Sequence, residues 1–198
     1  WVKTDGTTFS KQTVLNDGPA LLFDKPGSYV DVPSIPVDFN QPFCVESWCN
    51  PRDVARTKNR IRVLSTFGPC QLSIDQNREI AQAVIVDVLN QEKPLVSREI
   101  AIHNQLEKEE LHFALQWTGD DLLLFVNGVP HSKNFETWKH HENPITFIKR
   151  VTAASKSQKL RIGNFMDELT VTQSEDGHFS SSIHSFRISQ GLRYRIAF

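Results

Sequence analysis

Large apolar residues alternate with polar residues through much of this chain. From Leu111 to Trp117 every second residue is large and apolar, and Leu122–Val126 follows after a short turn. Because successive side chains of a strand point to opposite faces, the alternate apolar residues of the first segment are expected to lie in the core. Asn127-Gly128, directly after the second segment, is a dipeptide typical of tight hairpins. The pattern therefore predicts tightly coupled antiparallel strands here.

Similar period-two segments recur along the chain, separated by clusters of Gly, Pro, Asn and Asp. We expect further strands at Leu21–Phe23, Tyr29–Val32, Pro42–Cys49, Ile61–Leu64, Cys70–Ile74, Ala83–Leu89, Arg98–His103, Ile145–Ile148, Leu160–Ile162, Ile183–Ile188 and Arg193–Phe198. Helix signals are few, and no helices alternate with the strands, which argues against parallel α/β folds. The sequence predicts an all-β fold, an antiparallel β-sandwich or jelly roll, in which residues 1–198 form a single domain.

Charge and hydropathy limit the partners. The chain has 22 Lys and Arg residues against 23 Asp and Glu residues, so it lacks the positive excess that non-specific nucleic-acid binding needs. No apolar run approaches the roughly 18 residues needed to span a bilayer, so membrane insertion is not expected. The chain begins at Trp1 rather than Met, and we expect it to be a piece of a longer protein whose other domains are partners.

The chain contains three cysteines. Cys44 and Cys49 fall in one predicted strand, where about 16 Å would separate them, too far for a disulfide. A bond from Cys70 to either of them stays open. The more common alternative is that all three are small, buried, hydrophobic residues.

Several stretches form one ordered pattern along the chain. They are Leu22–Pro33 followed by Phe43–Trp48, the central hairpin Leu111–Gly128, and Leu160–Asn164 followed by Ile183–Tyr194. Together they resemble the laminin-G-like branch of the concanavalin A-like lectin and glucanase superfamily. The resemblance implies a jelly-roll sandwich, a recognition role at an extracellular, cell or virion surface, and ligand sites in loops.

Catalytic motifs are missing from the sequence. Glucanases of this superfamily carry Glu-x-Asp-x-x-Glu along one strand, and the chain has no such run, no Gly-x-Ser-x-Gly elbow and no His-Glu-x-x-His. We predict a non-catalytic, lectin-like domain that binds a glycan or glycoprotein. The alternatives are a structural or protein-interaction sandwich in a larger surface or fibre assembly, and an accessory domain of a glycoside hydrolase.

Sugar recognition needs an aromatic surface with polar groups beside it. Trp48 and Trp117 fall in strands that look like core, whereas the segment 135–143 is polar, aromatic and non-alternating. Its candidate ligand-binding residues are Trp138, Glu136, Lys139, His140, His141 and Asn143. The alternative is that Trp138 packs over the end of the sandwich. His140 and His141, with His131 nearby, are also transition-metal candidates, and the alternative is that they are simply exposed.

Some relatives of this fold bind calcium through loop carboxylates and carbonyls. Late, acidic, turn-like segments offer the hard oxygen ligands that calcium prefers. The candidate calcium ligands are Asn164, Asp167, Glu168, Glu175 and Asp176. The alternative is that these side chains are simply solvated.

Overall fold

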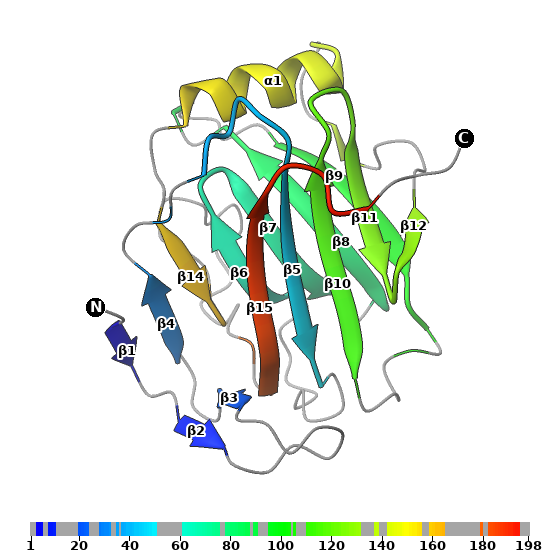
Figure 1. Ribbon diagram of the computed structural model, residues 1–198. Helices are drawn as coiled ribbons and strands as arrows, with labels where there is room; N and C mark the ends of the chain where they lie inside the picture. The colour runs from blue at the N-terminus through cyan, green and yellow to red at the C-terminus, as the bar shows by residue number, and fades with distance from the viewer. Residues whose placement is uncertain are drawn as a thin grey trace.

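Two antiparallel sheets face each other and form a sandwich (Figure 1). The computed structural model describes residues 3–5, 8–10, 20–23, 28–32, 35, 37–50, 61–75, 78–87, 89–90, 95–103, 105, 110–131, 137–138, 142–155, 159–164, 179 and 182–194. In these residues every strand pairing is antiparallel. The predicted all-β antiparallel sandwich is confirmed.

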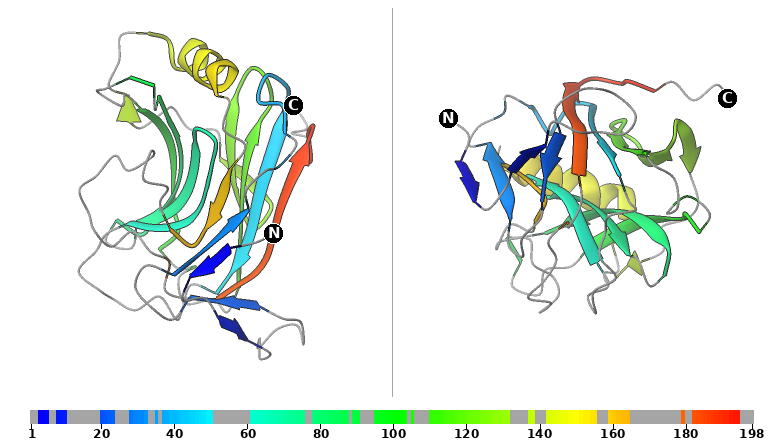
Figure 2. Two further views of the ribbon diagram at one scale, coloured as in Figure 1. Left: turned by 90° about the vertical axis from the view of Figure 1, so that its left-hand side faces the viewer. Right: turned by 90° about the horizontal axis from the view of Figure 1, so that it is seen from below.

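One layer is an eight-stranded sheet, counted over the described part of the chain, with the order β1-β4-β14-β6-β7-β8-β9-β13. Figure 2 shows that this sheet is strongly curved. Its strands are β1 (Lys3–Asp5), β4 (Tyr29–Val32), β14 (Leu160–Ile162), β6 (Ile61–Phe67), β7 (Cys70–Asp75), β8 (Ile80–Val86), β9 (Leu95–Ala101) and β13 (Thr137–Trp138).

The other layer has seven strands within the same described ranges, in the order β12-β11-β10-β5-β15-β3-β2. β15, the last strand among the described residues, lies inside this sheet, between β5 and β3. The strands are β12 (Val129–His131), β11 (Leu122–Val126), β10 (Leu111–Trp117), β5 (Phe43–Cys49), β15 (Ser182–Gln190), β3 (Ala20–Leu22) and β2 (Thr8–Ser10).

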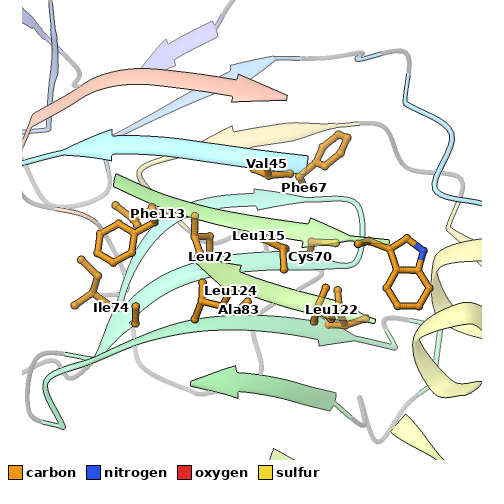
Figure 3. Packing of buried hydrophobic residues seen from close by; sticks show 14 of the residues in the cluster. Val45, Phe67, Cys70, Leu72, Ile74, Ala83, Phe113, Leu115, Leu122 and Leu124 are labelled. Carbon is orange, nitrogen blue, oxygen red and sulfur yellow. The ribbon is translucent and has the colours of Figure 1, made fainter. Parts of the chain in front are cut away.

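The core fills the space between the two sheets. The alternate apolar residues of β10 are all in it, and Trp117 is only 2% exposed, as the alternation predicts. Figure 3 shows Phe113 and Leu115 of β10 facing Leu72 and Ile74 of β7 across the interior. The predicted hairpin turn is also confirmed, because Asn127 and Gly128 have φ values of 51° and 77°.

Residues Ile145–Ile148 were expected to form a strand, and this prediction is wrong. They belong to the helix α1 (Pro144–Ala154), which crosses one end of the sandwich (Figure 1). Asn143 begins the helix, because its Oδ1 accepts a hydrogen bond from the Ile145 amide at 2.9 Å, and Pro144 suits the first helical position. The helix buries one face. Its buried side chains are Phe147, Ile148, Val151 and Thr152.

Of the last predicted strand, Arg193–Phe198, the structure describes only 193 and 194, which are irregular, and 195–198 lie outside the described residues. β15 ends at Gln190, and 191–194 run as an irregular segment over the outer face of the seven-stranded sheet (Figure 1). We call residues 191–194 the strap. In the described part of the chain, no helix has the length and apolar character needed to cross a bilayer.

All three cysteines are free and buried, which confirms the interpretation that they are small hydrophobic residues. Burial raises the pKa of the Cys44 thiol to about 12, and it also raises the pKa values of Cys49 and Cys70. Since only the thiolate is nucleophilic, we expect the folded protein to resist Ellman's reagent at mildly alkaline pH. The unfolded chain should release three equivalents of thionitrobenzoate. Rapid reaction of any thiol in the folded protein would contradict this burial.

Candidate functional site

Polar side chains gather on the outer face of the eight-stranded sheet. Leu72, Ala83 and Val96 point into the core, so their sequence neighbours in β7, β8 and β9 point outward. The outward polar side chains are nevertheless at most 9% exposed. Six of them form what we call the polar face: Thr66, Gln71, Ser73, Gln82, Ser97 and Glu99.

Strand register arranges the polar face in two rows across the sheet. In one row Gln71 pairs with Thr66 on β6 and with Val84 on β8, and Val84 in turn pairs with Ser97 on β9. In the other row Ser73, Gln82 and Glu99 lie side by side. The residues therefore come from four strands, β6 to β9, and share one surface.

A hydrogen-bond network links these rows to solvent. The Gln71 amide donates to Ser73 Oγ at 3.3 Å, and Ser73 Oγ donates to Gln82 Oε1 at 3.5 Å. The Gln82 amide then donates to Glu99 Oε1 at 3.2 Å. Both terminal nitrogens of Arg78 donate to the Glu99 carboxylate, and the Arg78 side chain is 55% exposed. The polar face thus reaches the surface at Arg78.

Two hydroxyl groups of the polar face have no hydrogen-bond partner among the described residues. They are Thr66 Oγ1 and Ser97 Oγ, both fully buried. Leaving a buried polar group unpaired costs roughly 1–3 kcal/mol, so such groups are uncommon without a reason. A third unpaired hydroxyl, Ser47 Oγ, lies on β5, where neighbouring alternate residues such as Val45 point into the core.

The predicted sugar-binding segment adjoins the polar face. The backbone of Trp138 lies in β13, where it pairs with Val96, and Thr137 pairs with Ser97. Asn143 caps α1 through its side-chain oxygen, which accepts from the Ile145 and Thr146 amides. Glu136, Lys139, His140 and His141 lie outside the described residues. The binding role of this segment stays a prediction.

The predicted calcium site is only partly within the described residues. Asn164 is half-buried and lies two positions after the end of β14. Asp167, Glu168, Glu175 and Asp176 lie outside the described ranges. Where the structure describes the chain, no three His, Cys, Asp or Glu side chains converge in a way that could hold a metal ion. Calcium binding stays a prediction.

A buried charge cluster lies on the outer face of the other sheet. Glu46 is 0% exposed, and Arg187 clamps its carboxylate with two hydrogen bonds, from Nε at 2.6 Å and from Nη2 at 2.8 Å. The Tyr194 hydroxyl donates to Glu46 Oε1 at 2.5 Å, and His112 Nε2 lies 3.5 Å from the same oxygen. We call Glu46, His112, Arg187 and Tyr194 the Glu46 cluster.

The cluster fixes the protonation state of its members. Burial by itself raises the pKa of Glu46, but the hydrogen bonds from Arg187 and Tyr194 outweigh burial and lower the pKa below its ordinary value of 4.5. Burial lowers the pKa of His112, against the opposing effect of Glu46. At neutral pH, Glu46 is therefore ionised and His112 is neutral. An ionised carboxylate that already accepts three hydrogen bonds is a poor general acid.

Gln116, together with the Glu46 cluster, holds the strap in place. Gln116 of β10 accepts hydrogen bonds from the Arg193 and Tyr194 amides at 2.8 and 2.9 Å, and it donates to the Tyr194 carbonyl. The Tyr194 ring centroid lies 4.5 Å from that of Phe125, and Tyr194 packs against a buried cluster that includes Cys44. The strap therefore closes over a small apolar patch on the outside of the sheet.

Trp48 was expected to be a core residue, and this expectation is wrong. Its side chain shares the outer face with Glu46, is half-buried, and stacks on His112 with ring centroids 4.3 Å apart. The alternation in β5 could have shown that Trp48 lies outside the core. Phe43, Val45 and Cys49 occupy the core positions and leave Trp48 on the opposite face. Sequence reasoning identified neither the polar face nor the Glu46 cluster.

Comparison with known proteins identifies solved structures of the same fold. No family model matches the sequence, and no curated protein sequence is significantly similar to it. Botulinum neurotoxin type C aligns with 96% of the chain at 10% identity and a TM-score of 0.58, and 43% of the toxin chain is covered. Mouse laminin α1 domains LG4-5 align with 85% of the chain at 11% identity and a TM-score of 0.54, over 41% of their own chain.

A Trypanosoma rangeli sialidase aligns with 97% of the chain at 12% identity and a TM-score of 0.54, over 27% of its own length. The chain thus spans less than half the length of each of these neighbours. Identities this low carry the fold and nothing more. The chain therefore has the two-sheet sandwich fold that also occurs in laminin G domains.

Proposed function

We propose that this chain is a non-catalytic recognition domain that binds a glycan at the polar face. The observation that carries the proposal is the pair of buried hydroxyls, Thr66 Oγ1 and Ser97 Oγ, that have no partner among the described residues, on a sheet face of amide, hydroxyl and carboxylate groups that reaches solvent at Arg78. Sugar hydroxyls both donate and accept hydrogen bonds, so a glycan can satisfy hydroxyl groups of either orientation. An apolar ligand would leave them unpaired.

The proposed site extends to the edge strand β13. Thr137 of β13 pairs with Ser97 of β9, so these two residues share one side of the sheet, whereas Trp138 pairs with Val96, which points into the core. The other predicted ligand residues of this segment adjoin β13 in sequence, and we propose that they border the polar face.

Two features of the neighbours support a recognition domain in a longer surface protein. Cell entry of botulinum neurotoxin type C depends on interaction with two ganglioside molecules, which are glycolipids. Each neighbour is also more than twice the length of the segment aligned with this chain. We accordingly propose an extracellular or cell-surface location, a glycan or glycoprotein partner, and attachment to further domains.

Ser97→Ala separates binding from stability. Removing an unpaired buried hydroxyl should leave the free energy of unfolding unchanged or raise it by about 1 kcal/mol, because no hydrogen bond in the free protein is lost. If a glycan bonds to this hydroxyl, the same change should weaken binding about fivefold or more. The measurements are urea unfolding, and a glycan array followed by calorimetric titration with the strongest array glycan.

Ser47→Ala is the matched control, since it removes an unpaired buried hydroxyl from the other sheet. It should behave like Ser97→Ala in unfolding and leave glycan affinity unchanged. Trp138→Ala tests the adjoining segment, and reduced binding by a variant whose urea unfolding matches that of the wild type would support a binding role for it. A blank array, or equal affinities in wild type and Ser97→Ala, would contradict the proposal. Stable self-association together with a blank array would favour an assembly module instead.

A further inference from the structure

Two arginines lie against one buried carboxylate on the outer face of the seven-stranded sheet. Arg187 Nε is 2.6 Å and Arg193 Nε is 3.6 Å from the same atom, Glu46 Oε2. Arg187 alone already neutralises Glu46 with two hydrogen bonds. The Arg193 guanidinium makes only the longer ion pair, and its side chain donates no hydrogen bond to a described residue. The two arginines therefore supply one positive charge more than is needed to neutralise Glu46.

Both guanidinium groups are open to solvent. The Arg187 side chain is 42% exposed and the Arg193 side chain is 44% exposed, although the carboxylate between them is fully buried. Arg187 uses Nε and Nη2 for Glu46, which leaves Nη1 without a partner among the described residues. Because both Nε atoms lie so close to one oxygen, a single carboxylate or sulfate group is large enough to contact both arginines.

Residues around the two arginines add hydroxyl groups and an aromatic side chain. On the same face of β15, Ser185 is exposed two positions before Arg187, and Ser189 is half-buried two positions after it. Ser185 pairs with Trp48, and the Arg187 guanidinium lies 5.3 Å from the centre of the Trp48 ring. Hydroxyl groups beside two guanidinium groups and an indole suit a ligand that carries an anionic group and several hydroxyls.

We infer that Arg187 and Arg193 form a binding site for an acidic saccharide, one bearing carboxylate or sulfate groups. The site lies on the outer face of β5 and β15, whereas the polar face lies on β6 to β9 of the opposite sheet. The backbone amide of Arg193 donates a hydrogen bond to Gln116 Oε1 at 2.8 Å, and this bond fixes the position of Arg193 in the strap. The anion site is thus independent of the glycan site proposed above.

Arg193→Gln tests the site without breaking the Arg187–Glu46 pair. Binding of the wild-type chain to immobilised heparin, polysialic acid and neutral dextran is measured by surface plasmon resonance at low and physiological salt. We expect binding to heparin or polysialic acid, which carry sulfate and carboxylate respectively, and about a tenfold loss in Arg193→Gln. Dextran should not bind here, and higher salt should weaken binding to either acidic polymer.

Lys149→Gln is the matched charge control, since it removes one half-exposed cation from α1, whose Nζ pairs with the exposed Asp120. It should keep wild-type affinity. Equal losses in Lys149→Gln and Arg193→Gln would show attraction by overall charge alone and overturn the site. So would wild-type affinity in Arg193→Gln, or no binding to either acidic polymer. Ser97→Ala should bind heparin and polysialic acid normally, so failure at the polar face is distinguishable from failure here.

Discussion

Gly163→Ala is expected to lower the free energy of unfolding by about 3 kcal/mol. Gly163 follows β14 with a φ of +90°, a conformation that residues with a side chain rarely adopt. A Cβ atom there would lie 2.3 Å from Cε1 of Phe23, whose ring is fully buried. Phe23 is itself packed edge-on against Phe179, with ring centroids 6.4 Å apart, so it has little freedom to move. Urea unfolding of the two proteins measures the loss.

Gly191→Ala separates the backbone cost from the steric cost. Gly191 has a φ of +89°, almost the same as Gly163, but an added Cβ would have no atom within 4 Å. We expect this variant to lose only the backbone term, about 1 kcal/mol. Phe23→Leu should relieve part of the loss in Gly163→Ala, so that the double variant is more stable than additivity predicts. Equal losses in the two glycine variants would contradict the clash with Phe23.

Arg187→Met is expected to lower the free energy of unfolding by about 3 kcal/mol at neutral pH. Removing one partner of a buried ion pair leaves the other charge without compensation, which typically costs 3–5 kcal/mol. We expect the lower end, because Tyr194 and Arg193 remain close to the Glu46 carboxylate. A thermal or urea unfolding series of the two proteins measures the difference. A loss below about 0.5 kcal/mol would show that Glu46 does not depend on this arginine.

The same pair predicts a dependence on pH. The folded state lowers the pKa of Glu46, so the ionised carboxylate contributes stability above its ordinary pKa of 4.5. That contribution is lost as the pH falls through the lower, folded-state pKa. Glu46→Gln should therefore lose less stability than wild type on acidification. The double variant with Arg187→Met should cost less than the two single changes added together. Parallel pH profiles for wild type and Glu46→Gln would contradict this assignment.

The local pattern of apolar and polar residues was sufficient to predict most of the strands, the hairpin turn and the sandwich class. The alternation from Leu111 to Trp117 reports directly which face is buried, and the sequence Asn127-Gly128 suits the two positive φ values that the turn needs. The antiparallel sandwich follows from many such segments without intervening helices. In contrast, the apolar, β-branched residues of Ile145–Ile148 suit a strand as well as a helix, and it is the Asn143-Pro144 cap that favours the helix.

The candidate sites could not be predicted in the same way because distant segments build them. Glu46 and Arg187 are 141 positions apart, and their hydrogen bonds depend on the register between β5 and β15. The polar face likewise needs the order of β6 to β9, which brings Thr66 and Ser97 onto one surface. A single sequence gives residue types, and it does not give the pairing that makes neighbours of them.

The position of β15 has a consequence for how the chain folds during synthesis. β15 fills an interior place in its sheet, beside a strand made some 140 positions earlier. Until residue 190 has left the ribosome, β5 has an open edge on one side, and such edges pair readily with other chains. Long-range closure of this kind is slow. Chains that lack β15 are therefore expected to aggregate more readily through this edge than the full chain.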